Sequence, residues 1–425
     1  MFKQIQAIKG TQDVLPPYGD TFRTLENLLL SIARNYGYSE IRTPVFEHTE
    51  LFSRGVGDTT DVVQKEMYTF DDKGGRSITL RPEGTAGVVR AFLEHGLFNE
   101  PMPQKLSYIT SCYRYEKPQT GRYREFHQFG VECFGASGPA VDAELIALGA
   151  AVFRTLGLDE VRLEVNSIGC PECRPNYHNA LKEYFAARRN DLCPTCLDRF
   201  ERNPLRILDC KSPVCSRIAK EAPIGLDFLC TDCGEHFDGL KANLNVLNID
   251  YSVNPRIVRG LDYYTKTVFE FITDTIGAQG TVCGGGRYDG LLTQLGGNPL
   301  PALGFGMGLE RLELVLQASG KKPPLPEPCA LYLVPIGDAA LQKASVICEK
   351  LRGKGIHTQF DIVGRSVKAQ MKYAGKIGAR YTVVLGEDDL NAGTVTLKRM
   401  ADGDKQTVGL ECLAEEFYDI ICTIN

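Results

Sequence analysis

Apolar residues recur three or four positions apart near the start of the chain, in the stretch TFRTLENLLLSIARNYGY at residues 21–38. This spacing predicts one long amphipathic helix, which the Asn-Tyr-Gly sequence closes. The following stretch, SEIRTPVFE, is predicted to be a strand at an edge or a boundary, because Pro44 lacks the N–H that a central strand requires. Short strands and helices then alternate up to about residue 165.

A cysteine-rich segment interrupts this alternation, and strand-rich sequence resumes after it. The strands on either side could pair in one antiparallel sheet. Near residue 317 the stretch QASGKKPPLPEP places four prolines in six positions, which predicts a linker. Beyond it, strands and helices alternate as in a small α/β domain with a mostly parallel sheet. We therefore expect a domain over residues 1–166 and 246–318, an insertion over 167–245, a linker over 319–328 and a C-terminal domain over 329–425.

The composition narrows the class of protein. With 43% hydrophobic and 24% charged residues, the chain has an ordinary globular mixture, which excludes a disordered or fibrous protein. It lacks an apolar run of membrane-spanning length, and its start does not resemble a signal peptide, so we expect a soluble cytoplasmic protein with no membrane partner. The net charge is only −5, so a nucleic-acid partner would require a local basic patch.

Eight of the fifteen cysteines lie within 64 residues. Persistent disulfides are not expected in a cytoplasmic protein. Nineteen residues separate the first two cysteine pairs, a spacing found in zinc ribbons. The pattern fits either one or two structural Zn²⁺ sites or reduced thiols inside a small helical insertion. The four pairs are Cys170 and Cys173, Cys193 and Cys196, Cys210 and Cys215, and Cys230 and Cys233.

Charged residues stand at the ends of several predicted strands. Glu83 follows a strand and precedes a helix, where a glutamate also simply favours the helix N-terminus. In the predicted hairpin SCYRYEKPQTGRYREFHQFGVECFG, a period of two places Gln128 and Glu132 on one face, with Gly130 leaving space between them. His127 alternates with apolar neighbours and is predicted to be a packed core histidine.

The stretch RGLDYYTKTVFEFIT, residues 259–273, reads as a buried strand behind an arginine and two tyrosines. Strict alternation would place Arg259 and Tyr264 on opposite faces, so we predict a bend at residues 260–262. Three consecutive glycines at 284–286 permit close approach to a ligand.

A further run, GFGMGLER, leads from a strand into a helix. One face of the strand carries no side chains at Gly304, Gly306 and Gly308, so a flat ring could lie against it. Arg311 stands in the first turn of the helix, where a cation is unfavourable unless an anion offsets it. Arginines suit a polyphosphate, and the carboxylates of Glu83 and Glu132 suit a ligand with cationic groups.

These segments resemble the histidyl-tRNA synthetases, a family of class II aminoacyl-tRNA synthetases. The helix up to Pro44 resembles motif 1, YRYEKPQTGRYREFHQ resembles motif 2 and GFGMGLER resembles motif 3, while RGLDYYTKTVFE and GGGRYDG are similar to the two signatures of the histidine enzymes. The resemblance covers nearly the whole chain. It implies an α+β catalytic domain with a seven-stranded-type antiparallel sheet, a homodimer built partly on motif 1, and a C-terminal α/β anticodon-binding domain.

The resemblance also implies a histidine–tRNA ligase. Such an enzyme activates L-histidine with ATP and Mg²⁺ to histidyl-adenylate and transfers the histidyl group to the 3′ end of tRNA(His). By similarity, the catalytic residues Arg114 and Arg259 hold the α-phosphate of ATP. Arg311 holds the γ-phosphate, with help from Arg122.

Histidine would be bound by two acids at its opposite ends. By similarity, Glu83 takes the α-ammonium group, while Glu132 and Tyr264 bond the imidazole nitrogens. An amino acid without ring N–H groups would leave Glu132 buried and unpaired, which favours histidine. The full set expected to contact histidine is Glu83, Thr85, Gln128, Glu132, Arg259, Tyr263, Tyr264 and Tyr288.

The C-terminal domain carries a basic row, Arg365, Lys368, Lys372 and Lys376, spaced three, four and four apart as on one helical face. This row is either a solvated surface or a contact with tRNA phosphates. An alternative for the whole chain is the synthetase-like regulatory subunit of ATP phosphoribosyltransferase, which binds histidine without catalysis and lacks the anticodon domain. A zinc-ribbon nucleic-acid-binding protein would explain the cysteines but not the arginines and glutamates.

Overall fold

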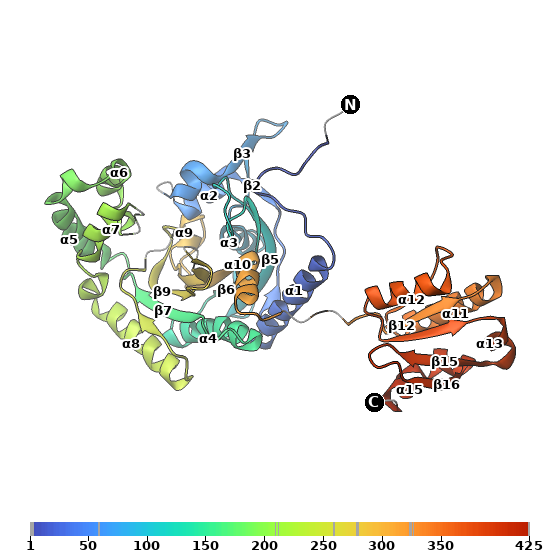
Figure 1. Ribbon diagram of the computed structural model, residues 1–425. Coiled ribbons are helices and arrows are strands. Elements are labelled where there is room, and N and C mark those ends of the chain that lie inside the picture. Colours follow the sequence, from blue (N-terminus) through green and yellow to red (C-terminus); the bar gives the residue numbers. More distant parts are fainter. Residues whose placement is uncertain are drawn as a thin grey trace. The chain divides into compact units, whose positions relative to one another are not determined.

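The computed structural model describes residues 4–57, 60–208, 210, 212–257, 260–277, 280–322, 325 and 327–423. The chain divides into two compact units, Met1–Pro324 and Leu325–Asn425 (Figure 1). Within the described ranges, no helix combines the length and the apolar character that crossing a membrane requires.

An eight-stranded sheet with the order β1-β5-β6-β11-β10-β9-β7-β8 forms the centre of the first unit. The six inner strands pair antiparallel, whereas the edge strands β1 (Ser39–Glu40) and β8 (Ser252–Val253) pair parallel with their neighbours. The sheet thus has one strand more than the seven-stranded type expected, with a two-residue strand at each edge. The inner strands are β5 (Gln104–Tyr113), β6 (Glu125–Phe134), β11 (Ala302–Gly308), β10 (Thr281–Arg287), β9 (Thr265–Ile272) and β7 (Arg162–Ser167).

The strands that flank the cysteine-rich insertion pair with each other, as predicted. β7 and β9 run antiparallel, with Arg162 opposite Ile272 and Ser167 opposite Thr267. The chain leaves the sheet after β7 and returns to it first at the edge strand β8 and then at β9.

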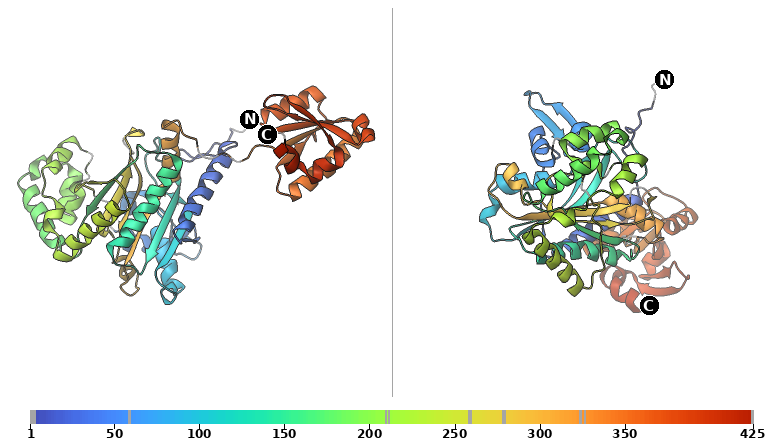
Figure 2. Two further views of the ribbon diagram at one scale, coloured as in Figure 1. Left: turned by 90° about the horizontal axis from the view of Figure 1, so that it is seen from below. Right: turned by 90° about the vertical axis from the view of Figure 1, so that its left-hand side faces the viewer.

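Helices cover both faces of the sheet (Figures 1 and 2). The larger core lies between the sheet and α1 (Tyr18–Asn35), α4 (Pro139–Leu156), α8 (Thr231–Val246) and α10 (Leu309–Ala318). A smaller core lies against α3 (Thr85–Glu94) and α9 (Leu291–Gln294). The helix predicted over residues 21–38 is α1, which ends before Gly37, a glycine with a left-handed φ of 84°.

Two smaller parts complete the first unit. A three-stranded sheet has the order β2-β4-β3. The one strand predicted for SEIRTPVFE is two, β1 in the large sheet and β2 in this one, and Pro44 lies at the boundary between them. The insertion is helical, also as predicted, and has its own small core. The elements are β2 (Phe46–His48), α2 (Thr49–Val56), η1 (Val62–Glu66), β3 (Tyr68–Asp71), β4 (Ser77–Leu80) and η2 (Leu97–Asn99), then in the insertion α5 (Arg174–Ala186), η3 (Arg189–Asp191), α6 (Pro194–Arg202), η4 (Pro204–Ile207), α7 (Pro213–Lys220) and η5 (Gly225–Phe228).

The C-terminal unit is an α/β fold with a five-stranded sheet in the order β13-β12-β14-β15-β16. The first three strands in this order are parallel, as expected, but β15 and β16 add an antiparallel hairpin, so the sheet is mixed. Its elements are β12 (Leu331–Pro335), α11 (Asp338–Gly353), β13 (Thr358–Phe360), α12 (Val367–Lys376), β14 (Tyr381–Leu385), α13 (Glu387–Ala392), β15 (Thr394–Arg399), β16 (Lys405–Gly409), α14 (Leu410–Glu415) and α15 (Phe417–Thr423).

A buried ion pair joins the sheet to two of its helices. Arg287 at the end of β10 is fully buried, and its Nε lies 2.8 Å from Oδ1 of Asp142 in α4. The same carboxylate contacts His236 of α8 and accepts a hydrogen bond of 3.0 Å from the hydroxyl of Thr267 in β9. One acid thus connects α4, α8, β9 and β10.

We expect Arg287→Met to lower the free energy of unfolding of the first unit by about 3–5 kcal/mol, because it leaves the Asp142 carboxylate buried without its cation. The control is Arg162→Met. Arg162 pairs with Asp274 at 2.9 Å, but these side chains are 57% and 82% exposed, so the expected loss is about 0–1 kcal/mol. Urea denaturation measures both, and equal losses would contradict a dominant role for the buried pair.

Candidate active site

One pocket of about 480 Å³ in the first unit brings together most of the residues predicted to bind a ligand. It opens over β6, β10 and β11, beside the start of α3 and the turn before β9. Glu132 and Tyr288 lie buried beneath it rather than in its wall, and Arg259 falls outside the described residues. The predicted residues that line the pocket are Glu83, Thr85, Arg114, Arg122, Gln128, Tyr263, Tyr264 and Arg311.

Glycines in the sheet make room for polar side chains under this pocket. Tyr108 of β5 is the cross-strand partner of Gly130 in β6, and its ring occupies the place that a side chain at 130 would take. The space predicted at Gly130 is therefore filled by the protein itself. In β11, Gly304 faces the carboxylate of Glu132, while Gly306 and Gly308 line the pocket. The Gln128 side chain covers Gly306, so the face of β11 expected to be clear for a flat ring is open only at its third glycine, Gly308.

Glu132 is a fully buried acid surrounded by hydroxyl groups. Its Oε1 accepts hydrogen bonds of 2.7 Å from Thr85 and 2.9 Å from Tyr108, and its Oε2 accepts one from Tyr288. Burial raises the pKa of Glu132 to about 8, against the opposing effect of these hydroxyl donors. Burial also raises the pKa of the Tyr108 and Tyr288 phenols.

Glu83 lies at the N-terminus of α3, which agrees with the interpretation that a glutamate at this position stabilises the start of the helix. Its carboxylate accepts hydrogen bonds from the backbone N–H groups of Thr85 at 2.7 Å and Ala86 at 2.8 Å. Burial raises its pKa, although these N–H groups act in the opposite direction. Because Glu83 also lines the pocket, this helix cap fixes an acid at the pocket wall.

The chain turns sharply before β9, as predicted. Residues 260–263 form a bend and a turn, and the strand begins only at Thr265. Tyr263 and Tyr264 are both buried, with ring centres 4.7 Å apart, and Tyr263 packs edge-on against Tyr288 at 5.5 Å. The turn therefore delivers both tyrosines to the same pocket instead of to opposite faces.

Three arginines reach the pocket, Arg114 and Arg122 from the connection between β5 and β6 and Arg311 from the first turn of α10. Arg114 donates from Nε to the Pro82 carbonyl at 2.8 Å and lies over the Phe126 ring at 5.3 Å. Arg311 donates to the backbone carbonyls of Gly121 at 3.1 Å and Thr281 at 2.8 Å.

The third, Arg122, pairs with Glu116 and lies 3.7 Å from Glu66. Backbone carbonyls therefore orient two of the guanidinium groups, whereas carboxylates hold the third. An anion in the pocket would meet three cations already held in place.

His127 faces away from this group. Its Nδ1 lies 2.8 Å from Oε1 of Glu310, and its ring packs edge-on against Phe22 at 5.1 Å. The hydrogen bond with Glu310 is the main reason that the pKa of His127 is raised. His127 is packed against Phe22, as predicted, but it is half-buried and paired with Glu310, so the expectation of a core position is wrong.

Tyr108 and Glu116 contact predicted site residues but were not themselves predicted from the sequence. Tyr108 donates to Glu132, and Glu116 holds Arg122. Tyr108 could have been found from Gly130 had the hairpin register been known, because the two are direct cross-strand partners. Nothing in the local pattern singles out Glu116, which lies in the irregular connection between β5 and β6.

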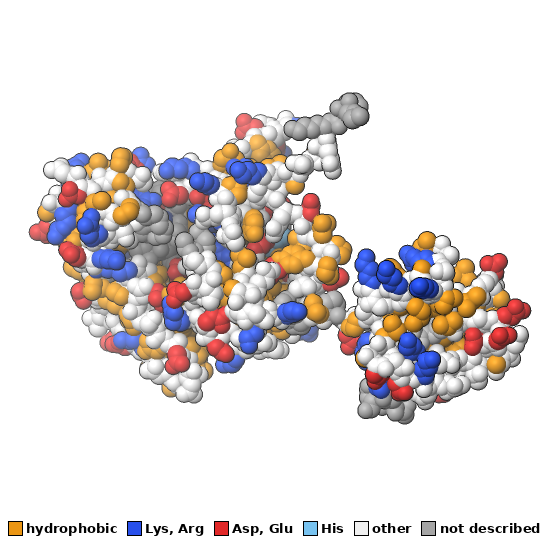
Figure 3. All heavy atoms as spheres, viewed as in Figure 1, with side chains coloured by type: hydrophobic (Ala, Val, Ile, Leu, Met, Phe, Trp, Pro, Cys, Tyr) orange, Lys and Arg blue, Asp and Glu red, His pale blue; other side chains and the backbone are white. Residues whose placement is uncertain are grey.

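The basic row of the C-terminal unit is only partly on a helix. Lys368, Lys372 and Lys376 are exposed on α12, and Figure 3 shows lysine and arginine side chains gathered on the α12 side of this unit. Arg365, however, precedes the helix, which begins after Ser366. Its guanidinium binds the Asp361 carboxylate at 2.8 Å and lies over the Tyr373 ring at 4.5 Å, so the expectation of one four-residue face is wrong at this position.

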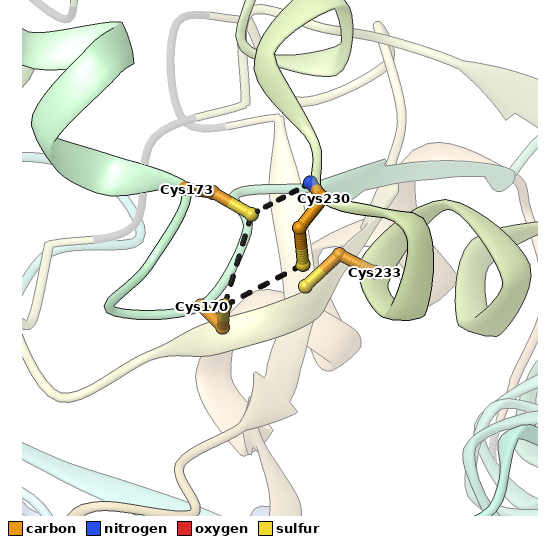
Figure 4. A group of neighbouring side chains, drawn as sticks. All are labelled: Cys170, Cys173, Cys230 and Cys233. Atoms are coloured by element: carbon orange, nitrogen blue, oxygen red, sulfur yellow. Dashed lines mark hydrogen bonds between the residues drawn. The ribbon is translucent and has the colours of Figure 1, made fainter.

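The cysteine pairs associate in a nested order. Cys170 and Cys173 meet Cys230 and Cys233, while the inner group consists of Cys193, Cys196, Cys210 and Cys215 (Figure 4 shows the outer group). The zinc-ribbon spacing between the first two pairs is therefore misleading, because the 13-residue helix α5 carries the chain away from one pair to the other.

Comparisons with known proteins agree on one family. A family model described as Histidyl-tRNA synthetase matches residues 10–171 and 231–312, and one described as Anticodon binding domain matches residues 330–419. A histidine–tRNA ligase of Acetivibrio thermocellus is 54% identical over 96% of this chain and 98% of its own length. A histidine–tRNA ligase of Caldanaerobacter subterraneus subsp. tengcongensis is also 54% identical, over 95% of this chain and 97% of its own length.

Solved structures give a consistent result. The apo histidyl-tRNA synthetase of S. aureus is 39% identical and superposes with a TM-score of 0.83, covering 97% of this chain and 100% of that one. A structure titled as an ATP phosphoribosyltransferase regulatory subunit/histidyl-tRNA synthetase from Bacillus halodurans is 23% identical with a TM-score of 0.65, covering 91% of this chain and 100% of that one. At that identity the second match speaks for the fold alone.

The buried acid Glu132 gives a test by pH. Its pKa is raised from 4.5 to about 8 in the folded chain, so the stability it contributes is fully present below the lower value and is lost as pH rises through the higher one. Between about pH 5 and 7.5 it should lower the free energy of unfolding by about 1.4 kcal/mol per pH unit. Glu132→Gln removes this component, so the variant should gain stability relative to the wild type as pH rises. Parallel pH profiles in urea denaturation would contradict the assignment.

Proposed function

The chain belongs to the histidyl-tRNA synthetase family, and from this premise we propose that it activates L-histidine with ATP to histidyl-adenylate and transfers the histidyl group to the 3′ end of tRNA(His). The observation that carries the proposal is the composition of the 480 Å³ pocket. Three arginines line it together with Glu83, two from the connection between β5 and β6 and one from α10, and the buried Glu132 accepts a hydrogen bond from the pocket residue Thr85.

The arginines form the ATP side of the pocket. In the first step, an ionised carboxylate oxygen of histidine attacks the α-phosphorus, and pyrophosphate leaves with the electrons of the broken P–O bond. This attack needs no general base, so the protein acts by positioning the reactants and stabilising phosphate charge. We assign the α-phosphate to Arg114 and Arg259, the γ-phosphate to Arg311, and a supporting contact to Arg122. Mg²⁺ bound with ATP would supply further charge neutralisation.

Glu83 and its neighbours form the histidine side. Glu83 is assigned to the α-ammonium group, since its carboxylate is fixed by two backbone N–H groups and lines the pocket. Thr85 and Gln128 lie beside it. Gln128 is oriented because its Oε1 accepts the Gly84 N–H at 3.0 Å. A cation at this point would offset the burial of Glu83.

The imidazole is assigned to Glu132 and Tyr264, with Tyr263 and Tyr288 packed around it. An imidazole N–H would replace one of the hydroxyl donors that Glu132 now accepts. An amino acid of similar size without a ring N–H could not make this exchange, and it would displace a hydroxyl without replacing its bond. The cost of such an unpaired buried group is about 1–3 kcal/mol, which favours histidine.

We assign anticodon binding to the C-terminal unit. A match to an anticodon-binding model over residues 330–419 and three exposed lysines of α12 support it. Exposed apolar side chains, Ile362 at 78% and Val363 at 66%, lie just before this helix. Surfaces that bind single-stranded RNA typically combine cations, which bind the phosphates, with neighbouring apolar side chains, which contact the bases.

We extend the proposal to organisation and assembly. Residues 1–166 and 246–318 would form the catalytic domain, 167–245 the insertion, 319–328 the linker and 329–425 the anticodon-binding domain. A homodimer built partly on motif 1 is supported by exposed apolar residues on and beside the small sheet, among them Phe46 at 56% and Phe70 at 49%. We also propose that the protein is located in the cytoplasm. Each tetracysteine cluster would hold a Zn²⁺ ion with a structural and not a catalytic role.

The regulatory-subunit alternative is less well supported. The relatives that are 54% identical over nearly their full lengths are ligases, and the structure whose title names the regulatory subunit is similar at the level of the fold. A direct assay separates the two functions.

With L-histidine, ATP and Mg²⁺, the protein is expected to exchange labelled pyrophosphate into ATP. Glu83→Gln should raise the KM for histidine about ten- to a hundredfold by removing a charged hydrogen-bond partner, whereas Arg311→Met should raise chiefly the KM for ATP. The exposed Arg162→Met serves as the unaffected control. Absence of exchange from folded wild-type protein would favour the regulatory subunit.

Replacing Lys368, Lys372 and Lys376 together by glutamate should reduce charging of tRNA(His) while pyrophosphate exchange stays at the wild-type rate, because the change affects phosphate contacts and not the pocket. The salt dependence of tRNA binding should also weaken. Lys405→Glu, on the exposed strand β16, is the control. A loss of exchange equal to the loss of charging would contradict this assignment.

A further inference from the structure

We propose that the insertion holds two Zn²⁺ ions, one in each tetracysteine cluster, and that together they fix the part of the insertion that supports the histidine-binding turn. The root cluster is Cys170, Cys173, Cys230 and Cys233, at the point where the insertion leaves and rejoins the catalytic sheet (Figure 4). The arm cluster is Cys193, Cys196, Cys210 and Cys215, inside the insertion.

The sulfur separations fit a tetrahedral metal site. A Zn–S bond of about 2.3 Å places the sulfurs of a regular tetrahedron about 3.8 Å apart. In the root cluster, Cys170 Sγ lies 3.7 Å from that of Cys173 and 3.8 Å from that of Cys230. In the arm cluster, the Sγ atoms of Cys193 and Cys210 are 3.8 Å apart. A disulfide would require about 2.05 Å, so the four thiols of each cluster surround a centre instead of pairing.

Backbone N–H groups point at several of these sulfurs. In the root cluster, the N–H of Cys230 donates to Cys173 Sγ at 3.0 Å, which Figure 4 draws as one of its dashed lines. In the arm cluster, the N–H of Cys193 donates to Cys215 Sγ at 3.2 Å, and that of Ser212 to Cys210 Sγ at 3.5 Å. Hydrogen bonds of this kind stabilise the negative charge of metal-bound thiolates and orient them.

All four ligands of each cluster come from cysteines, which leaves no position for a substrate and marks the sites as structural. A need for such support is evident, since residues 174–229 form a small core around Leu181, Phe185 and Ile207. A core of this size contributes limited hydrophobic stabilisation, and small domains commonly compensate with metals or disulfides.

Between the cysteines of the arm cluster lies a residue that contacts the turn before β9. Arg206 of η4 stands between the two cysteine pairs of this cluster. It is buried, its guanidinium binds the Asp262 carboxylate at 2.7 Å, and it donates to the carbonyl of Gly260 at 3.0 Å. Asp262 and Gly260 belong to the turn that delivers Tyr263 and Tyr264 to the pocket.

The root cluster holds the other end of the same turn. The backbone N–H of Lys266 donates to the carbonyl of Gly169 at 2.9 Å, and the Thr265 hydroxyl donates to the same carbonyl at 3.1 Å. Gly169 immediately precedes Cys170. Arg174, next to Cys173, donates to the carbonyl of Tyr264. Metal at the two clusters would thus fix both ends of this turn. That the turn binds histidine rests on the proposed function.

The test begins with the full-length protein, purified without chelators and analysed for metals by mass spectrometry. Wild type is expected to carry two zinc ions per chain, and X-ray absorption should give four sulfur neighbours at about 2.3 Å. Cys173→Ser and Cys196→Ser should each carry one. Cys348→Ser, which changes a buried thiol of α11 outside both clusters, should carry two.

If the serine variants fail to fold, Co²⁺ replaces zinc as the probe in the wild-type chain, where two tetrahedral sulfur sites give intense thiolate-to-cobalt absorption at a stoichiometry of two. Protein that holds neither metal, iron in place of zinc, or a mass lowered by disulfide formation would overturn the assignment. These measurements are independent of catalysis, so their failure is distinct from a failure of the proposed function.

The link to the pocket is tested with Arg206→Met, a positioning variant that keeps all eight cysteines. It should retain two zinc ions and raise the KM for histidine in pyrophosphate exchange about tenfold, with the KM for ATP unchanged. Cys196→Ser should show the same split between the two substrates. Equal changes in both KM values, or none in either, would overturn the positioning role even if zinc is bound.

Discussion

The candidate active site depends on burying one carboxyl group, Glu132, inside a β-sheet domain. A buried acid is costly unless donors surround it, and its donors come from three places: Tyr108 on β5, Thr85 at the start of α3 and Tyr288 after β10. The missing side chains at Gly130 and Gly304 give the space for Tyr108 and Glu132. Because these elements are distant in sequence, the site exists only when the whole sheet is assembled.

A second buried acid ties that sheet to its helices. Asp142 connects Arg287, His236 and Thr267, and so holds β9, β10 and α8 against α4. β10 runs from this ion pair to the pocket floor, and α8 begins at the root of the insertion. The geometry of the pocket and the attachment of the insertion therefore share one anchor.

Local patterns predicted the parts of the structure that local forces decide. The period of two in β6 placed Gln128 and Glu132 on the pocket side, and the mismatch between Arg259 and Tyr264 required the bend that is seen at residues 260–263. What failed depended on pairing between distant segments. The partner of Gly130 needs the register of β5 and β6, the nested cysteines need the path of α5, and Arg365 is held off its expected face by Asp361.

The two halves of the pocket are held in place by different kinds of contact. Arg114 and Arg311 are oriented by the carbonyls of Pro82, Gly121 and Thr281, so backbone groups directly fix the two arginines that we propose for the phosphates. Tyr263 and Tyr264, in contrast, lie on a turn held by contacts from outside the sheet. These include the Asp262 N–H to the Val56 carbonyl at 3.1 Å and the Arg206 ion pair. Because the position of a turn depends on the groups that hold it, our proposal implies that the insertion affects the fit of the amino acid more than the binding of ATP.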